Sequence, residues 1–276
     1  MHQGTGAWLL QTDSFRLWES SKKAILWCPG IPGAGKTYLS AVAAHRLRSR
    51  NDENKVAVLT LFLGYTDKDS QSLTFLIAAL LKQLVQMYPV LAKDVLQTYE
   101  SHVLKKTFPN LTDLTGLLRS TLDNFERTFI IIDALDEIRE ESDSFKLLEL
   151  LSCDDLGLMI TSRPKPSVSN FFSINPLCEV CQKEGSGKLV SCETCTQDKN
   201  RCAACFENAS TCQEESHSIT TRFSATRVDI RASQDDIERY IQSRIDRSPK
   251  VLKLVNSNRI SRARIVDTVS TRANGM

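Results

Sequence analysis

The segment from Cys28 to Ser40, CPGIPGAGKTYLS, constrains the fold of this chain more than any other stretch. It contains the pattern G-x-x-x-x-G-K-[ST], which spans Gly30 to Thr37. A compact apolar run, Ala24 to Cys28, precedes the pattern, and apolar residues at helical spacing follow it. The sequence therefore predicts a buried strand, a glycine-rich loop and a helix in direct succession.

Such a loop is suited to hold phosphate. Its glycines let backbone N–H groups converge on an anion, and the next helix points the positive end of its dipole at the same place. Lys36 would reach the β- and γ-phosphates, and the Thr37 hydroxyl would bind Mg²⁺. The alternative, a glycine loop without a ligand, is disfavoured by the matching strand and helix. The predicted residues for binding ATP or GTP with Mg²⁺ are Gly30, Gly33, Ala34, Gly35, Lys36, Thr37, Tyr38 and, from a later strand, Asp133.

The apolar run RTFIIIDALDE, residues 127–137, predicts a strand that ends in acids. It would place Asp133 at the carboxyl end of the strand, where ligands bind in parallel sheets. We expect Asp133 to hold Mg²⁺ through water, the alternative being a solvated acidic turn. Asp136 and Glu137 follow, and either could orient the attacking water as a base. Glu137 is the first choice.

The short segment ITSRP places Arg163 at the tip of the next predicted strand. In the usual strand order this strand lies beside the one that carries the glycine loop. An arginine there could sense the γ-phosphate, and the alternative is a surface arginine before a turn proline. The predicted catalytic residues are thus Glu137, Asp136 and Arg163.

Predicted strands and helices alternate along most of the 276 residues, which favours an α/β fold. We predict a P-loop NTPase with a mostly parallel sheet flanked by helices, plus an inserted small module that holds two zinc ions. Residues 4–22 predict one amphipathic helix, and TRVDIRAS predicts a return strand after the insertion. The predicted division is 1–175 for the NTPase core, 176–217 for the zinc-binding insertion and 218–276 for the return strand and C-terminal helices.

The insertion is predicted from its cysteines. Three C-x-x-C pairs, a further cysteine and a histidine make eight candidate ligands: Cys178, Cys181, Cys192, Cys195, Cys202, Cys205, Cys212 and His217. Zn²⁺ takes four thiolate or imidazole ligands in tetrahedral geometry, so eight ligands suit two closed structural sites. The intervening loops are too polar to form a core, and metal binding would have to fold them. Disulfides or free thiols are the alternative.

The spacing of these ligands leaves their pairing open. A sequential scheme joins Cys178, Cys181, Cys192 and Cys195 in one site, and Cys202, Cys205, Cys212 and His217 in the other. An interleaved scheme joins Cys178, Cys181, Cys202 and Cys205, and leaves Cys192, Cys195, Cys212 and His217 for the second site.

Charge and hydropathy exclude some classes of partner. The net charge is +2 with 25% charged residues, too balanced to indicate nucleic acid or a membrane surface as the main partner. No apolar run is long enough for a transmembrane helix. The first residues, MHQGTGAWLLQTDSF, lack the features of a secretory signal, which predicts a cytoplasmic, reducing location. The nine cysteines then indicate metal binding or buried thiols.

Together these motifs resemble the NACHT-type NTPases of the STAND class of signalling switches, most closely the fungal, nephrocystin-3-like group. The similar pieces are GTGAWLL, LWCPGIPGAGKT, IIIDALDE, TSRP and VDIRASQDDIERYIQSRI, which span nearly the whole chain outside the cysteine-rich segment. The resemblance implies that Gly4 to Trp8 lies close to the adenine. It also implies that the phosphate, Mg²⁺ and sensor positions are Lys36, Thr37, Asp133 and Arg163.

Proteins of this class continue into a winged-helix region and then into repeats, and they often carry an N-terminal effector domain. We expect this chain to be a fragment or a truncated gene product. The cysteine-rich segment resembles a ZZ-type zinc finger, a family that interleaves its two sites and usually ends with two histidines. Cys212 stands in one of those histidine places. The resemblance implies a module that binds a protein partner, and the alternative is a stable surface insert.

Three functions remain to be weighed. The favoured one is a switch that binds ATP or GTP with Mg²⁺ and hydrolyses it slowly, so that self-association of a longer form, and signalling in fungal innate immunity, depend on the nucleotide. An adaptor, in which the zinc module binds a protein and the NTPase is a scaffold, comes second. A motor or a small-molecule kinase comes last, because no second substrate site is evident.

Overall fold

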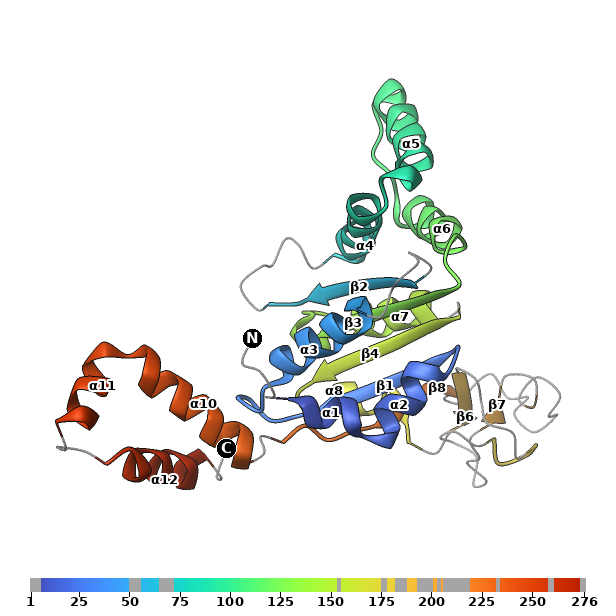
Figure 1. Ribbon diagram of the computed structural model, residues 1–276. Coiled ribbons are helices and arrows are strands. Elements are labelled where there is room, and N and C mark those ends of the chain that lie inside the picture. Colours follow the sequence, from blue (N-terminus) through green and yellow to red (C-terminus); the bar gives the residue numbers. More distant parts are fainter. Residues whose placement is uncertain are drawn as a thin grey trace.

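The computed structural model describes residues 6–49, 56–64, 72–152, 155–174, 178–181, 188–192, 201–202, 205, 219–231, 234–257 and 261–273. Its centre is a parallel sheet of five strands in the order β2-β3-β4-β1-β9 (Figure 1). The strands are β1 (Ala24–Pro29), β2 (Val56–Phe62), β3 (Arg127–Asp133), β4 (Leu156–Ser162) and β9 (Thr226–Arg227). Strand β4, which leads to Arg163, pairs with β1 as the sequence predicted.

Helices cover both faces of this sheet. The helices are α1 (Ala7–Gln11), α2 (Asp13–Ser20), α3 (Lys36–Ser49), α4 (Leu73–Met87), α5 (Ala92–Lys105), α6 (Leu111–Leu122), α7 (Glu141–Ser152), α8 (Pro166–Ser169), α10 (Gln234–Arg247), α11 (Pro249–Asn256) and α12 (Arg262–Ala273). Two short 3-10 helices are η2 (Pro89–Leu91) and η3 (Leu135–Glu137). The predicted α/β architecture is thus confirmed.

The alternation of side chains along β1 shows how the two faces are filled. Ile25 and Trp27 join a core that includes residues of α4, α6 and α7. Leu26 and Cys28 join a second core with residues of α1, α2 and α3. Because both faces are buried, the strands are continuous apolar runs rather than alternating ones, which is the pattern that the sequence shows.

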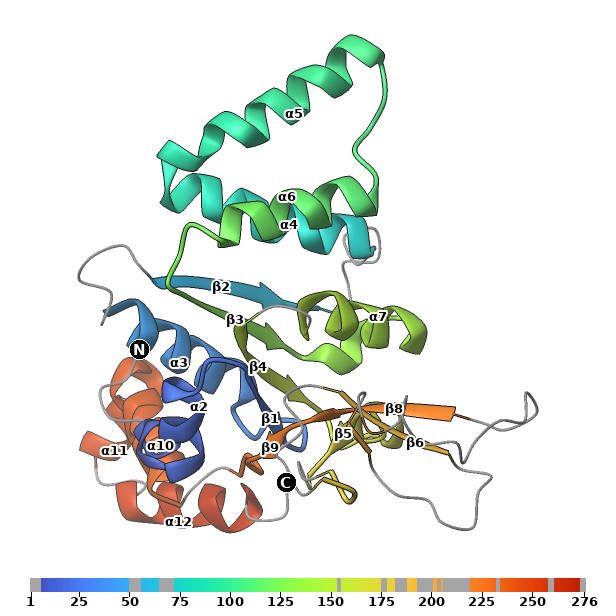
Figure 2. The same cartoon turned by 90° about the vertical axis from the view of Figure 1, so that its right-hand side faces the viewer.

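A second, smaller sheet joins the cysteine-rich segment to the rest of the protein. Its order is β5-β8-β6-β7. The strands are β5 (Phe172–Ser173), β6 (Lys188–Cys192), β7 (Arg201–Cys202) and β8 (Ile219–Ser224). Strand β8 pairs parallel with β5 and antiparallel with β6, and after Ser224 the chain continues into β9 of the main sheet. One segment, 219–227, therefore belongs to both sheets (Figure 2).

The segment before α1 contacts the start of α10. The backbone N–H of Gly6 donates to the Asp236 carboxylate at 3.3 Å, which ties the segment before α1 to the first turn of α10. Helices α10, α11 and α12 lie at this side of the sheet, whereas α5 stands beyond α4 and α6 at the opposite side (Figure 2). Within the described ranges, no helix combines the length and the hydropathy needed to cross a membrane.

Candidate functional site

The loop between β1 and α3 has the backbone geometry of an anion site. Gly33 and Gly35 have φ angles of 83° and 88°, a region that glycine enters at little cost. A Cβ built on either glycine would meet nothing within 4 Å, so open space lies beside the loop. Helix α3 begins at Lys36, and the N–H groups of its first turn have no partner within the helix. The residues present therefore fit a phosphate group.

Gly30 has a different role from the other two glycines. Its added Cβ would lie 2.9 Å from the backbone oxygen of Ile230 and 3.0 Å from the Cβ of Ile230. The N–H of Ile230 donates to the oxygen of Pro29 at 2.7 Å. Gly30 thus allows the segment after β9 to pack against the start of the loop. Its place in the sequence motif did not reveal this contact.

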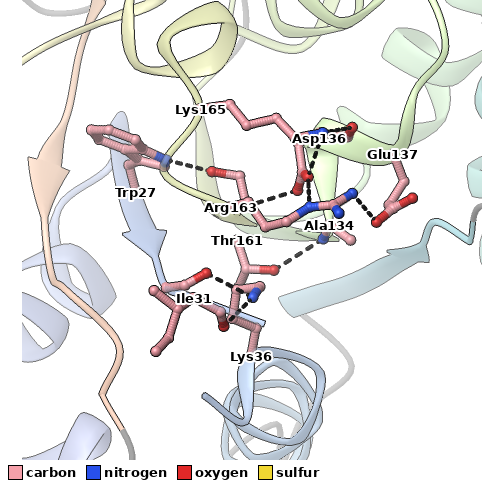
Figure 3. Close-up of polar contacts among 11 residues, drawn as sticks. Trp27, Ile31, Lys36, Ala134, Asp136, Glu137, Thr161, Arg163 and Lys165 are labelled. Carbon is pink, nitrogen blue, oxygen red and sulfur yellow. Dashed lines mark hydrogen bonds and ion pairs between the residues drawn. The ribbon is translucent and has the colours of Figure 1, made fainter. Parts of the chain in front are cut away.

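Lys36 lies over the loop. Its ammonium group donates to the backbone oxygens of Gly30, at 2.8 Å, and Ile31, at 2.9 Å (Figure 3). Burial lowers the pKa of Lys36, and the nearby Asp136 and Asp133 carboxylates oppose this shift in part. The Lys36 ammonium group is thus held at the loop by uncharged acceptors. A phosphate oxygen could replace them with a stronger bond between opposite charges.

Asp133 lies at the carboxyl end of β3 and is buried. Three hydroxyl groups donate to its carboxylate: Thr37 to Oδ2 at 2.6 Å, Ser40 to Oδ1 at 2.9 Å and Thr161 to Oδ1 at 2.6 Å. The structure thus brings the two predicted Mg²⁺ residues into direct contact across 96 positions of sequence. Carboxylate and hydroxyl oxygens are ligands that Mg²⁺ prefers, so this donor set fits the ion.

The two further acids contact the predicted sensor arginine. Asp136 accepts hydrogen bonds from the Arg163 backbone N–H, at 2.9 Å, and from the Arg163 side chain. Glu137 accepts from another nitrogen of the same guanidinium group (Figure 3). Lys165 lies 3.3 Å from the Asp136 carboxylate. The Asp136 side chain is 1% exposed and that of Glu137 is 19% exposed, so Glu137 is the more accessible of the two candidate bases.

The charge of Asp136 stabilises this corner of the fold. Burial alone would raise the Asp136 pKa, but the hydrogen bonds from the backbone and side chain of Arg163 outweigh it and hold the pKa below its usual value. A carboxyl group with a lowered pKa in the folded state contributes stability above its unfolded-state pKa. This contribution is lost as the pH falls below about 4 through the folded-state pKa.

We therefore expect Asp136→Asn to lower the free energy of unfolding at pH 7 by about 1.5–2 kcal/mol. This is the lower part of the range for hydrogen bonds to charged groups, because Arg163 is one-third exposed and solvent screens it. The difference from wild type should shrink as the pH falls below about 4. Urea unfolding across this pH range measures both effects, with Asp123→Asn as the control on an exposed aspartate. An unchanged stability at pH 7 would show that the ion pair contributes nothing.

The structure also shows site residues that the sequence did not indicate. Ser40 and Thr161 both donate to Asp133, and neither belongs to the motif that was used to find the loop. The indole N–H of Trp27 donates to the Ser162 hydroxyl at 3.0 Å, which fixes β1 against the tip of β4. A hydroxyl residue at the end of a strand next to the loop strand is the signal that could have identified Thr161.

The cysteine-rich segment brings four predicted ligands together. The sulfur atoms of Cys178, Cys181, Cys202 and Cys205 all lie within 4.8 Å of one another. Those of Cys181 and Cys202 are 3.9 Å apart, close to the separation of about 3.8 Å that a tetrahedral zinc–thiolate site requires. The arrangement is that of the interleaved scheme. Of the other four predicted ligands, Cys195, Cys212 and His217 lie outside the described residues. The backbone of Cys192 is described, but its side chain is not.

The thiols of this cluster have shifted pKa values. Burial raises the Cys178 pKa, but hydrogen bonds from the backbone at Cys181, Cys202 and Val180 outweigh it and lower the pKa to about 6. Hydrogen bonding with the Cys202 and Cys181 sulfurs raises the pKa of Cys205 to about 12. Four adjacent thiolates need a cation to coexist, so this chemistry fits a zinc ion.

The cysteine-rich segment contacts α7, the helix that follows Asp136 and Glu137. Lys188 of β6 forms an ion pair with Glu149 of α7 at 2.8 Å. On the same helix, the ring of Phe145 contacts Phe223 of β8, with centroids 5.2 Å apart. Strand β6 is thus joined to α7 by an ion pair, and its partner strand β8 is joined to α7 by an aromatic contact.

Three solved structures are similar in fold, and the chain covers less than two thirds of each. A DNA replication initiation factor has a TM-score of 0.37 and 13% identity, over 98% of this chain and 61% of that chain. The ORC1 protein of Aeropyrum pernix, in complex with DNA, has a TM-score of 0.44 and 12% identity, over 94% and 58%. The ORC2 protein of Aeropyrum pernix, in ADPNP–ADP complexes, has a TM-score of 0.37 and 15% identity, over 59% of this chain and 41% of that chain.

Because the identities and TM-scores are low, we draw nothing about function from these three structures. No curated protein has significant sequence similarity to the chain.

A family model, described as nephrocystin 3, N-terminal, matches residues 4–163. This match covers more than half of the chain, and it includes the glycine loop, the Asp133 strand and Arg163. The protein therefore belongs to the nephrocystin 3 N-terminal family and has the fold of a nucleotide-binding P-loop NTPase.

Proposed function

We propose that this protein is a signalling switch of the NACHT and STAND type, which binds ATP or GTP with Mg²⁺ and hydrolyses it slowly. The observation that carries the proposal is the contact between Thr37 and Asp133 beside an open glycine loop. In this proposal Gly33, Gly35 and Lys36 bind the phosphates, and Thr37 and Asp133 hold Mg²⁺. The bound magnesium nucleotide supplies the phosphoryl group and the cation that neutralises its charge.

The acids and Arg163 support slow rather than rapid hydrolysis. Glu137 is the proposed general base, and in this structure it is paired with Arg163. A salt bridge lowers the basicity of a carboxylate, so Glu137 becomes a better base when Arg163 releases it. Asp136 is buried and bonded to both the backbone and the side chain of Arg163, which suits an anchor for the arginine. Arg163, once released from Glu137, is the proposed sensor.

We expect Glu137→Gln to lower the rate of nucleotide hydrolysis by about 100-fold or more, because general-base catalysis contributes factors of this size. Nucleotide affinity should change little. Single-turnover release of phosphate measures the rate, and Glu141→Gln is the control on an exposed glutamate at the start of α7. Hydrolysis at the wild-type rate by Glu137→Gln would remove this residue from the proposed chemistry.

Control of self-association in a longer form, signalling in fungal innate immunity and a cytoplasmic location are parts of the same proposal. The adaptor function is the second candidate, supported by the four-thiol cluster. We propose that the module, about residues 176–217, binds two structural zinc ions and presents a surface for a protein partner. Partner binding that survives loss of nucleotide binding but not loss of zinc would favour the adaptor.

A further inference from the structure

Thr161 occupies a central position between the parts of the proposed site. It lies at the penultimate position of β4 and is fully buried. Its hydroxyl donates to Oδ1 of Asp133 at 2.6 Å and accepts from the backbone N–H of Ala134 at 3.0 Å. One hydroxyl group thus holds both the carboxylate at the end of β3 and the first peptide after it.

The second of these contacts determines where the acids lie. Ala134 has φ 62° and ψ 49°, the left-handed conformation, in which the Cβ of a non-glycine residue is crowded by the following carbonyl oxygen. The 3-10 helix that starts at Leu135 follows directly and carries Asp136 and Glu137. The hydrogen bond to Thr161 satisfies the Ala134 N–H in this strained turn (Figure 3). Displacing Thr161 would therefore affect both Asp133 and the turn that presents the acids.

We propose that Thr161 is a positioning residue that fixes the Mg²⁺ carboxylate Asp133 and the acid-bearing turn in one arrangement. The inference rests on the proposed magnesium nucleotide site and goes beyond it by assigning a role to Thr161, to which the sequence analysis of ITSRP assigned none. Groups that orient a metal ligand through hydrogen bonds affect metal affinity by about 10–100-fold. The hydroxyl of Thr161 acts on Asp133 in this way, and it alone of the three hydroxyl donors also contacts Ala134 among the hydrogen bonds described.

The chain supplies matched variants for a test. Thr161→Val keeps the shape of the side chain and removes its hydroxyl, whereas Thr161→Ser keeps the hydroxyl. Ser40→Ala removes a donor to the same Asp133 oxygen without touching Ala134. Ser162→Ala removes the neighbouring buried hydroxyl of β4, which accepts from Trp27 and serves as the control for general damage to the strand.

Two measurements on the full chain separate positioning from folding. The first is the Mg²⁺ concentration that gives half-maximal enhancement of ATP or GTP binding, measured together with nucleotide affinity in EDTA. We expect Thr161→Val to raise this concentration by about 10–100-fold, with unchanged affinity in EDTA, and Thr161→Ser to restore it. Ser40→Ala should have a smaller effect and Ser162→Ala none. The second is hydrogen exchange at the Ala134 amide without nucleotide, which only Thr161→Val should accelerate.

The outcomes distinguish this inference from the proposed function. A wild-type Mg²⁺ requirement and wild-type Ala134 exchange in a folded Thr161→Val chain would overturn the inference and leave the nucleotide site intact. Failure of the wild-type chain to bind magnesium nucleotide would overturn both. Should Thr161→Val not fold, a wild-type Mg²⁺ requirement in a folded Thr161→Ala chain would equally overturn the inference.

Discussion

Replacing Lys36 by alanine should lower the affinity of the chain for magnesium nucleotide by about 100-fold or more, because a charge-assisted phosphate contact is lost. In the structure the ammonium group donates only to the backbone oxygens of Gly30 and Ile31 among its described hydrogen bonds. Hydrogen bonds that involve a charged group contribute about 1.5–3 kcal/mol each, and the loss here is smaller because water can replace the ammonium group at this open loop. The variant should therefore fold and fail to bind, which separates a binding defect from unfolding.

Equilibrium titration with ATP and with GTP in the presence of Mg²⁺ measures this effect. Lys82→Ala is the matched control, because Lys82 is an exposed lysine on α4, outside the loop. Thermal unfolding of both variants checks that each is folded. Retention of wild-type affinity by a folded Lys36→Ala chain would mean that the glycine loop is not the site of the phosphates.

Removal of zinc should unfold the cysteine module. The four sulfurs of the described cluster lie within 4.8 Å of one another, and they belong to short segments on either side of β6. Zinc binding in isolated zinc-finger peptides contributes apparent free energies of about 10–16 kcal/mol. The pairing of two short strands contributes less free energy than this, so it cannot keep the segment folded without zinc. We expect a chelator to abolish the protection of β6 and β7 from hydrogen exchange while β1, β3 and β4 keep theirs.

Metal content provides the second measurement of this effect. The wild-type chain should carry about two zinc ions, and Cys178→Ser should lose the ion of the described cluster. Ser191→Ala is the control within the module, because the buried Ser191 hydroxyl has no hydrogen-bond partner within the described residues. A purified, folded chain without zinc, with β6 still protected after chelation, would show that the cluster is not a structural metal site.

The sequence predicted the parts of the fold that depend on local patterns. Ala24–Pro29 and Arg127–Asp133 are buried on both faces, so their apolar runs indicated strands directly. The single helix expected over residues 4–22 is wrong. The helix is interrupted at Thr12, whose extended backbone ends α1. The Thr12 hydroxyl accepts a hydrogen bond from the Phe15 N–H and so caps α2. The helical spacing of apolar residues continues through such a break, so the sequence pattern did not reveal the boundary between α1 and α2.

Other features depend on contacts between distant segments, which leave no local pattern in the sequence. Of the return strand expected from TRVDIRAS, only Thr226 and Arg227 form β9, and an isolated parallel bridge from Ile230 to Gly30 follows them. Likewise Thr161 was not identified, since its hydroxyl acts on a carboxylate 28 positions away. The glycine loop, in contrast, was found because its function requires residues that are adjacent in sequence.

The most direct test of the account is equilibrium titration of the zinc-loaded wild-type chain with ATP and with GTP, each with Mg²⁺ and with EDTA. The geometry of Thr37 and Asp133 predicts saturable binding of at least one nucleotide, stronger with Mg²⁺ than without it. Absence of binding to both nucleotides by a folded, zinc-loaded chain would contradict the proposed nucleotide site and move the adaptor function to first place.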